Sequence, residues 1–145
     1  LAARGVQRKG VYRCKGGDIQ LVTDLLDRPN GLAFSPAGDV LWVANSNKFA
    51  ASWTAFAVTD DLPLQPIMVL AEGEPGTSPD AICGVPHIAP VHYLGPMPGK
   101  GVSDGFKIDE NGLLWSSMPA GVCILDPRPP RPHVVAKILF HTNIS

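Results

Sequence analysis

One pattern occurs twice in this sequence, first in Asn30-Gly-Leu-Ala-Phe-Ser-Pro-Ala-Gly38 and again in Asp104-Gly-Phe-Lys-Ile-Asp-Glu-Asn-Gly112. Each copy has an amide or carboxylate side chain, a glycine, a short apolar strand, a polar turn and a second glycine. A tryptophan follows each copy, Trp42 and Trp115, and the two coincide after a shift of one residue. Such a repeat predicts a fold built from similar units, each of which packs against its neighbours.

Short apolar segments of strand length fill the chain around these two copies. They are bounded by turn residues, and no long helical pattern interrupts them. The 15 glycines and 15 prolines among 145 residues supply frequent turns. The predicted strands are Gly10–Cys14, Ile19–Val22, Gly31–Ser35, Val40–Ala44, Trp53–Val58, Ile67–Leu70, Gly105–Asp109, Leu113–Ser117, Gly121–Leu125 and Val134–Leu139.

The repeat and the strands together predict an all-β chain, a β-propeller whose units are four-stranded blades. In this interpretation residues 30–70 and 104–139 form two complete blades, and residues 10–25 form the outer half of a preceding blade. Residues 140–145 begin a further blade. The Pro- and Gly-rich region 71–103 is an insertion, which either covers a channel mouth or has no role. Because blades depend on their neighbours, we expect the chain to be part of a longer protein.

Composition and charge argue against several classes of protein. The 12 basic and 13 acidic side chains give a net charge of -1, which is not that of a nucleic-acid-binding arm. The apolar content of 45% is too high for a disordered linker. No apolar run approaches the roughly 18 residues of a membrane span. We therefore expect no nucleic acid, no membrane and no obligate protein partner.

The compartment is not determined by the sequence. Residues 1–10 lack the apolar core of a signal peptide, which favours the cytoplasm, but the chain begins with Leu and the true N-terminus is expected to lie upstream. The odd number of cysteines and the absence of C-x-x-C spacing disfavour a disulfide framework and a structural zinc site. The cysteines are Cys14, Cys83 and Cys123.

Several other residues have structural interpretations. Ser46 and Ser103 lie outside any G-x-S-x-G motif, which disfavours a serine hydrolase. The histidines are interpreted as surface or turn residues, the tryptophans as packing between blades, and three acidic residues as turn or cap residues. These residues are His87, His92, His133 and His141, then Trp42, Trp53 and Trp115, then Asp109, Glu110 and Asp126.

Asn30 and Asp104 occupy the same position in the two copies of the repeat, each at the start of an inner strand and each before a glycine. In a propeller, equivalent positions of successive inner strands face one another across the channel. The glycine would let the backbone turn tightly and bring the side chain to the channel mouth. Amide and carboxylate oxygens suit Ca²⁺ or Mg²⁺ and tolerate Mn²⁺ or Zn²⁺. Both motifs are also ordinary turn sequences, so a plain turn is the alternative.

An ordered set of motifs resembles the SMP-30/gluconolactonase/LRE-like family. The similarity extends from about Gly10 to Asn143 apart from the insertion. It implies a six-bladed propeller that hydrolyses a lactone with one divalent cation in its channel. The motifs are Asp27–Pro36 with Leu41–Ser46, then Ser103–Asp109 with Gly112–Trp115 and Gly121–Pro127.

The resemblance also implies roles for particular residues. Asn30 matches the metal-binding asparagine of the family's N-G-L motif, and Asp104 matches its metal-binding aspartate, which is also the favoured general base. The family's glutamate ligand and a substrate-contacting asparagine would lie upstream of Leu1. Two departures stand out: Ser103 replaces a common proline, and Asn45-Ser46 replaces a common Asp-Ser.

The sequence therefore predicts a lactonase of the gluconolactonase type that acts on a small-molecule lactone. One divalent cation, Ca²⁺ before Zn²⁺, Mn²⁺ or Mg²⁺, would polarise the carbonyl and activate a water that Asp104 holds or deprotonates. By itself the chain should have little or no activity, and its open edges should favour aggregation. The alternatives are a non-catalytic calcium-binding or protein-interaction propeller, and a strictosidine-synthase-like relative that does not use the metal. The pair Asn30 and Asp104 argues against the second.

Overall fold

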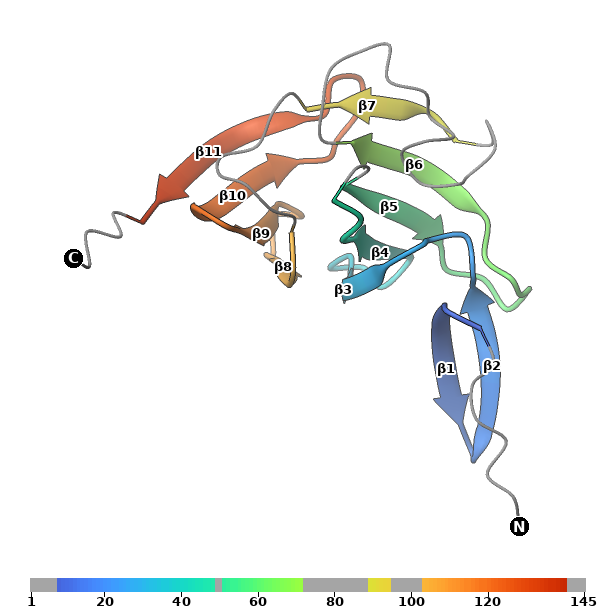
Figure 1. Cartoon of the computed structure of the whole chain (residues 1–145). Coiled ribbons are helices and arrows are strands. Elements are labelled where there is room, and N and C mark those ends of the chain that lie inside the picture. Colours follow the sequence, from blue (N-terminus) through green and yellow to red (C-terminus); the bar gives the residue numbers. More distant parts are fainter. Residues whose placement is uncertain (1–7, 49–50, 72–88, 95–102, 141–145) are drawn as a thin grey trace, which may run out of the picture.

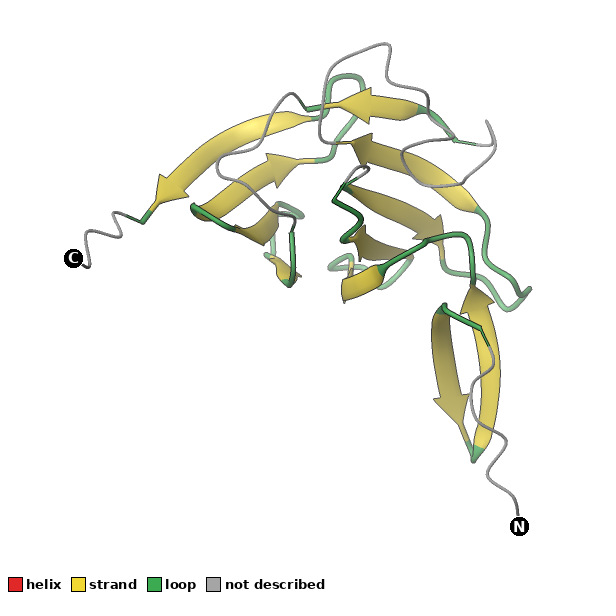
Figure 2. Ribbon diagram, viewed as in Figure 1, coloured by secondary structure: helices red, strands yellow, loops and turns green. Residues whose placement is uncertain are grey.

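The computed structural model describes residues 8–48, 51–71, 89–94 and 103–140, and this part of the chain forms strands and no helices (Figure 2). The all-β prediction is therefore confirmed. The strands are β1 (Val11–Lys15), β2 (Asp18–Thr23), β3 (Pro29–Phe34), β4 (Val40–Asn45), β5 (Ser52–Ala57), β6 (Pro66–Ala71), β7 (Val91–Tyr93), β8 (Phe106–Ile108), β9 (Leu114–Met118), β10 (Gly121–Asp126) and β11 (His133–Leu139).

The strands are arranged in three sheets that follow the order of the chain (Figure 1). β1 and β2 form a hairpin, β3 to β7 form the first sheet, and β8 to β11 form the second sheet. Neighbouring strands are antiparallel except for β7, which runs parallel to β6. β7 lies within the region 71–103, so three residues of that Pro- and Gly-rich region extend the first sheet.

The two sheets place the repeated sequence in the same register. Trp42 on β4 pairs with Ala33 on β3, and Trp115 on β9 pairs with Lys107 on β8. These partners stand three positions after Asn30 and Asp104, respectively, so the tryptophans are structural equivalents. The repeat seen in the sequence therefore corresponds to a repeat in strand pairing.

The shift of one residue between the copies arises in the turn that follows the first strand of each sheet. In the first sheet the Ser35 N–H donates to the Val40 carbonyl, and in the second the Asp109 N–H donates to the Leu113 carbonyl. The first turn is longer by one residue, Asp39, whose carboxylate accepts a hydrogen bond from the Ser35 hydroxyl at 2.7 Å. Each turn contains a glycine with positive φ, Gly38 at 76° and Gly112 at 81°, a backbone conformation that residues with a side chain rarely adopt.

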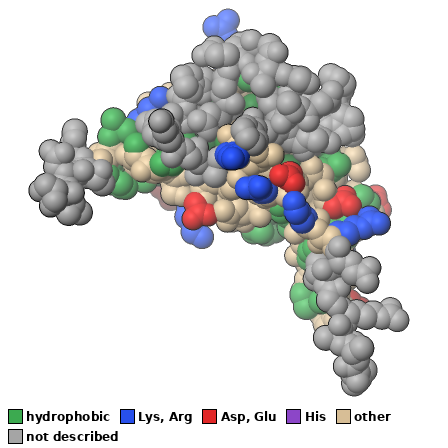
Figure 3. Space-filling model, in the orientation of Figure 1, with side chains coloured by type: hydrophobic (Ala, Val, Ile, Leu, Met, Phe, Trp, Pro, Cys, Tyr) green, Lys and Arg blue, Asp and Glu red, His purple; other side chains and the backbone are tan. Residues whose placement is uncertain are grey.

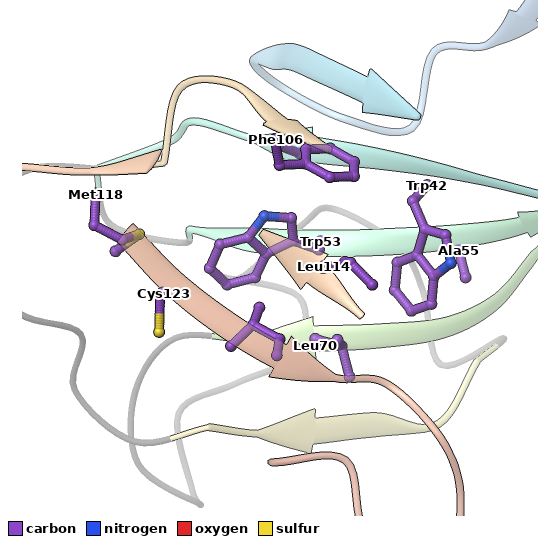
Figure 4. Packing of buried hydrophobic residues seen from close by; sticks show 10 residues of the cluster. Trp42, Trp53, Ala55, Leu70, Phe106, Leu114, Met118 and Cys123 are labelled. Atoms are coloured by element: carbon purple, nitrogen blue, oxygen red, sulfur yellow. The ribbon is translucent and has the colours of Figure 1, made fainter. Parts of the chain in front are cut away.

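Each face of the first sheet contributes to a separate apolar core. Side chains on one face pack against the second sheet, and Trp53 lies at the centre of this core beside Phe106 and Leu114 (Figure 4). Side chains on the opposite face, including Phe56, pack against the hairpin. Because side chains alternate across a strand, neighbouring residues of β5 serve different cores. The first sheet is thus covered on both faces.

The second sheet is covered on one face only. Leu114 and Ser116 point toward the first sheet and are fully buried, whereas Trp115 between them is 38% exposed. The packing predicted for tryptophans is confirmed for Trp42 and Trp53. For Trp115, whose indole N–H donates to the Asp109 carboxylate at 2.9 Å, packing against a further blade stays a prediction. The reason is that none of the described residues forms a sheet against the face from which Trp115 projects.

The described surface shows no segregation of charge in the view of Figure 3, where Lys and Arg side chains are interspersed with Asp and Glu. This agrees with the balanced composition and the net charge of -1. No helix that is long and apolar enough to cross a membrane occurs in residues 8–48, 51–71, 89–94 and 103–140.

Candidate functional site

The structure brings together the two residues predicted to form a site. Asn30 belongs to β3, Asp104 precedes β8, and these two strands lie beside one another (Figure 1). The Asn30 Nδ2 donates to the Asp104 Oδ1 at 2.5 Å across a separation of 74 residues in the sequence. Both side chains are exposed, so a ligand can reach them from solvent.

The backbones beneath these side chains are also joined. The Gly31 N–H donates to the Asp104 carbonyl at 3.1 Å. A Cβ at Gly31 would lie 2.9 Å from that carbonyl oxygen and 3.0 Å from the Gly105 Cα, whereas a Cβ at Gly105 would meet nothing within 4 Å. Neither glycine has positive φ. The two glycines therefore do not share a need for a tight turn. Gly31 is needed because two backbones approach closely there, and Gly105 has no such constraint.

Asp104 follows a buried hydroxyl cluster that the sequence analysis did not identify. The Ser103 and Ser116 Oγ atoms are 2.6 Å apart, and the Trp53 Nε1 donates to the Ser116 Oγ at 3.2 Å. The Ser46 hydroxyl donates to the Ser103 carbonyl. In the sequence, Ser103 stands out only as a departure from the family's pattern, Ser46 only as the neighbour of one, and Ser116 only as a polar residue where the first copy of the repeat has Val43. None of these signals indicates that the hydroxyls contact one another.

An open groove of about 590 Å³ adjoins the Asn30 and Asp104 pair. Gly31 and Gly105, the residues that follow the pair, contribute to its wall. The remaining lining residues come mainly from β8, β9 and β10 and include Lys107 and Trp115.

Two carboxylates away from the pair, Asp109 and Asp126, have pKa values below the usual range, and both act in turns as predicted. The Trp115 indole hydrogen bond, followed by the Leu113 N–H, lowers the pKa of Asp109. A bidentate contact with the Arg128 guanidinium lowers the pKa of Asp126 to about 2. The hydrogen bonds keep both carboxylates ionised. Both carboxylates make structural contacts and do not join Asp104 in a site.

The chemistry of the Asn30 and Asp104 pair fits an oxygen-preferring divalent cation. Such ions take roughly six to eight oxygen ligands, which include carboxylates, side-chain amides and water. A half-turn of the Asn30 carboxamide exchanges its nitrogen and oxygen, which would direct two oxygens toward one point. Among the residues that the structure describes, no group of three or more His, Cys, Asp or Glu side chains is placed to hold a metal. The pair therefore provides two ligands.

The remaining candidate residues lie away from the pair or outside the described residues. His133 is exposed at the start of β11, and His92 is half-buried in β7. Cys14 is exposed on β1, and Cys123 is buried on β10. His87, His141 and Cys83 lie outside the described residues.

Comparison with known families gives a direct assignment. Residues 2–140 match the family described as the SMP-30/Gluconolactonase/LRE-like region. The chain belongs to this family, as its motifs predicted.

Proteins similar to this chain include gluconolactonases. The chain is 29% identical over 120 residues to the gluconolactonase of Zymomonas mobilis, a match that covers 81% of this chain and 29% of the relative. The structure of a gluconolactonase from Xanthomonas campestris matches with 28% identity and a TM-score of 0.62, over 94% of this chain and 36% of that one. A second solved structure, of a proposed gluconolactonase, matches with 24% identity and a TM-score of 0.57, over 94% and 37%.

These comparisons bear on both fold and extent. The all-β arrangement of radiating sheets is consistent with the propeller-like fold of gluconolactonases. The chain spans about a third of the length of the proteins that it matches.

Proposed function

We propose that this chain is part of a divalent-metal-dependent hydrolase that opens a sugar lactone, with Asn30 and Asp104 as cation ligands and Asp104 also as general base. The observation that carries the proposal is the contact between these two side chains, which occupy equivalent positions of the repeat. Membership of the SMP-30/gluconolactonase/LRE-like family supports it. Without the contact, the family would indicate a class of reaction but no site in this chain.

The same proposal assigns the sheets to blades of a six-bladed propeller. Residues 30–70 and 104–139 are two complete blades, and residues 10–25 are the outer half of the preceding one. The region 71–103 is an insertion between blades, and residues 140–145, which lie mostly outside the described residues, begin the next blade. The arrangement of β3 and β8 side by side is what successive inner strands of a propeller require.

The chain's own residues divide the chemistry between them. When bound, a divalent cation supplies polarisation of the ester carbonyl and compensation of the charge that develops on its oxygen. The Asn30 amide donates to one Asp104 carboxylate oxygen, which keeps the two side chains adjacent until the carboxamide turns its oxygen toward a bound cation. Asp104 is exposed, so its second oxygen can take a proton from an attacking water.

The donor set favours Ca²⁺ as the resident ion, with Mg²⁺, Mn²⁺ and Zn²⁺ as alternatives, since an amide and a carboxylate are hard oxygen ligands. A sugar lactone is the proposed substrate, because the relatives are gluconolactonases. We expect little or no turnover from the 145-residue chain alone, which spans about a third of those relatives.

Cation binding by the longer protein that carries this segment provides the direct test. Titration calorimetry with Ca²⁺ and with Mn²⁺ should give a saturable site that Asp104→Asn weakens at least about 10-fold, because the carboxylate is the charged ligand. Asp39→Asn is the matched control, since Asp39 is another exposed carboxylate that accepts one side-chain hydrogen bond. It should leave the affinity unchanged. Equal affinity in Asp104→Asn and the unmodified chain would contradict the assignment of ligands.

Hydrolysis is tested in the longer protein that carries this segment. Asp104→Asn there should lower the turnover of gluconolactone by about 100-fold or more, which is the scale of general-base catalysis. Unchanged turnover, with the cation bound, would leave Asp104 without the proposed role as base.

A further inference from the structure

The loop before β8 is held at three consecutive residues. The Ser103 carbonyl accepts the Ser46 hydroxyl, the Asp104 carbonyl accepts the Gly31 N–H, and both the N–H and carbonyl of Gly105 bond to the hydroxyl of Ser117. The loop is therefore attached to both sheets. Asp104 has no freedom to move away from Asn30 unless some of these bonds break.

A buried chain of hydroxyl contacts continues from this loop into the core between the sheets. Ser103 is 1% exposed and Ser116 is fully buried, and their Oγ atoms lie 2.6 Å apart. The indole N–H of Trp53, also fully buried, donates to the Ser116 Oγ at 3.2 Å. A buried polar group is costly unless it is hydrogen-bonded, so these groups depend on one another. We call Ser46, Ser103, Ser116 and Trp53 the serine cluster.

The internal repeat shows that packing alone does not require the cluster. The register that equates Trp42 with Trp115 places Val43 at the position of Ser116, and Val43 is fully buried in the first sheet. An apolar side chain can therefore fill this buried position of the strand. Pro29 stands likewise at the position of Ser103, and it has no hydroxyl. At these two positions, the hydroxyl stands only in the copy of the repeat that carries the carboxylate.

We propose that the serine cluster is a positioning device that holds Asp104 against Asn30 and thereby sets the affinity of the pair for a divalent cation. This inference rests on the proposed function, because it assigns the cluster to the same cation site. Ser103 and Ser116 touch neither the cation nor the substrate; they act through the loop that bears Asp104. Such supporting contacts typically contribute 10- to 100-fold to the affinity of a metal site.

The test measures the Ca²⁺ and Mn²⁺ affinity of the longer protein that carries this segment, by titration calorimetry. Ser103→Ala and Ser116→Ala should each weaken binding about 10-fold. Ser116→Thr, which keeps the hydroxyl, should recover most of the affinity. Trp53→Phe removes the indole N–H together with part of the buried ring, and it provides a second route to the same loss if Ser116→Ala does not fold.

The matched control is Ser35→Ala, at the far end of β3. Ser35 also makes two hydrogen bonds through its hydroxyl, to the Asp39 carboxylate and from the Val40 N–H. Its loss should lower stability by a similar amount but leave the cation affinity within about twofold, since a surface turn is not coupled to the site. Equal losses of affinity in Ser35→Ala and Ser116→Ala would show that the cluster only stabilises the fold, and this would overturn the inference.

A double variant separates this inference from the proposed function. If the cluster acts through Asp104, then Asp104→Asn combined with Ser116→Ala should bind no more weakly than Asp104→Asn alone. Wild-type affinity in Ser103→Ala and Ser116→Ala, together with weak binding by Asp104→Asn, would overturn the inference and leave the proposed function intact. Wild-type affinity in Asp104→Asn itself would overturn both.

Discussion

The two sheets of this protein carry the same pattern, but their tryptophans have different environments. Trp42 in the first sheet is 6% exposed, because the second sheet packs over it, whereas Trp115 at the equivalent position is 38% exposed. The strand pairing around the two residues is the same. The alternation of a strand thus decides which face a side chain takes, and the neighbouring sheet decides whether that face is buried.

The largest expected difference lies in truncation of the two tryptophans. Trp42→Ala should reduce the free energy of unfolding by about 3–5 kcal/mol, because it opens a cavity in a packed core. Trp115→Ala should reduce it by less, about 1–2 kcal/mol, since the side chain is 38% exposed, leaves no closed cavity and loses part of its packing and one hydrogen bond. Urea unfolding followed by circular dichroism measures both, and equal losses would show that Trp115 is buried in solution.

A smaller difference is expected between the glycines that follow Asn30 and Asp104. Gly31→Ala should cost about 1–3 kcal/mol, because the new Cβ would press against the Asp104 carbonyl and displace the backbone. Gly105→Ala enters open space and should change stability by about 1 kcal/mol at most. Each variant is the control for the other in the same unfolding experiment. A harmless Gly31→Ala would refute the close approach of the two strands.

The smallest effect concerns a contact that one sheet has and the other lacks. Asp126 in the second sheet pairs with Arg128, whereas the equivalent residue of the first sheet is Ala57. The folded pKa of Asp126, about 2, lies below its ordinary value of 3.8. The pair therefore stabilises the fold above about pH 4, and this contribution is lost as the pH falls toward 2.

Arg128→Gln should remove this dependence. We expect the pKa of Asp126 to rise toward its ordinary value and the stability at neutral pH to fall by about 1 kcal/mol or less, since the Arg128 side chain is 64% exposed although that of Asp126 is only 13% exposed. A nuclear magnetic resonance titration of the Asp126 carboxyl and acid unfolding between about pH 4 and 2 measure the two effects. Arg131→Gln serves as the control because it removes one positive charge elsewhere. An equal rise of the Asp126 pKa in that variant would show that the net charge, and not the contact with Arg128, lowers this pKa.

Much of the molecule could be predicted from local patterns in the sequence. Alternating apolar residues bounded by glycine and proline indicated the strands, since a strand needs only its own residues to define two faces. The repeat indicated equivalent positions, and from these came Asn30 and Asp104 as neighbours across 74 residues. The family followed from the same motifs.

The remaining features depended on contacts between distant segments, which no local pattern encodes. Whether a tryptophan is buried depends on the presence of another sheet, and the need for Gly31 arises from the backbone of Asp104 rather than from its own turn. The serine cluster joins β5, β9 and two loops, and each of its hydroxyls looks ordinary in the sequence. The sequence determined the strands, the repeat and the paired residues, because these depend on side-chain type and spacing. Only the tertiary structure decided which faces are covered and what holds Asp104 in place, because burial and hydrogen bonding are set by neighbours in space.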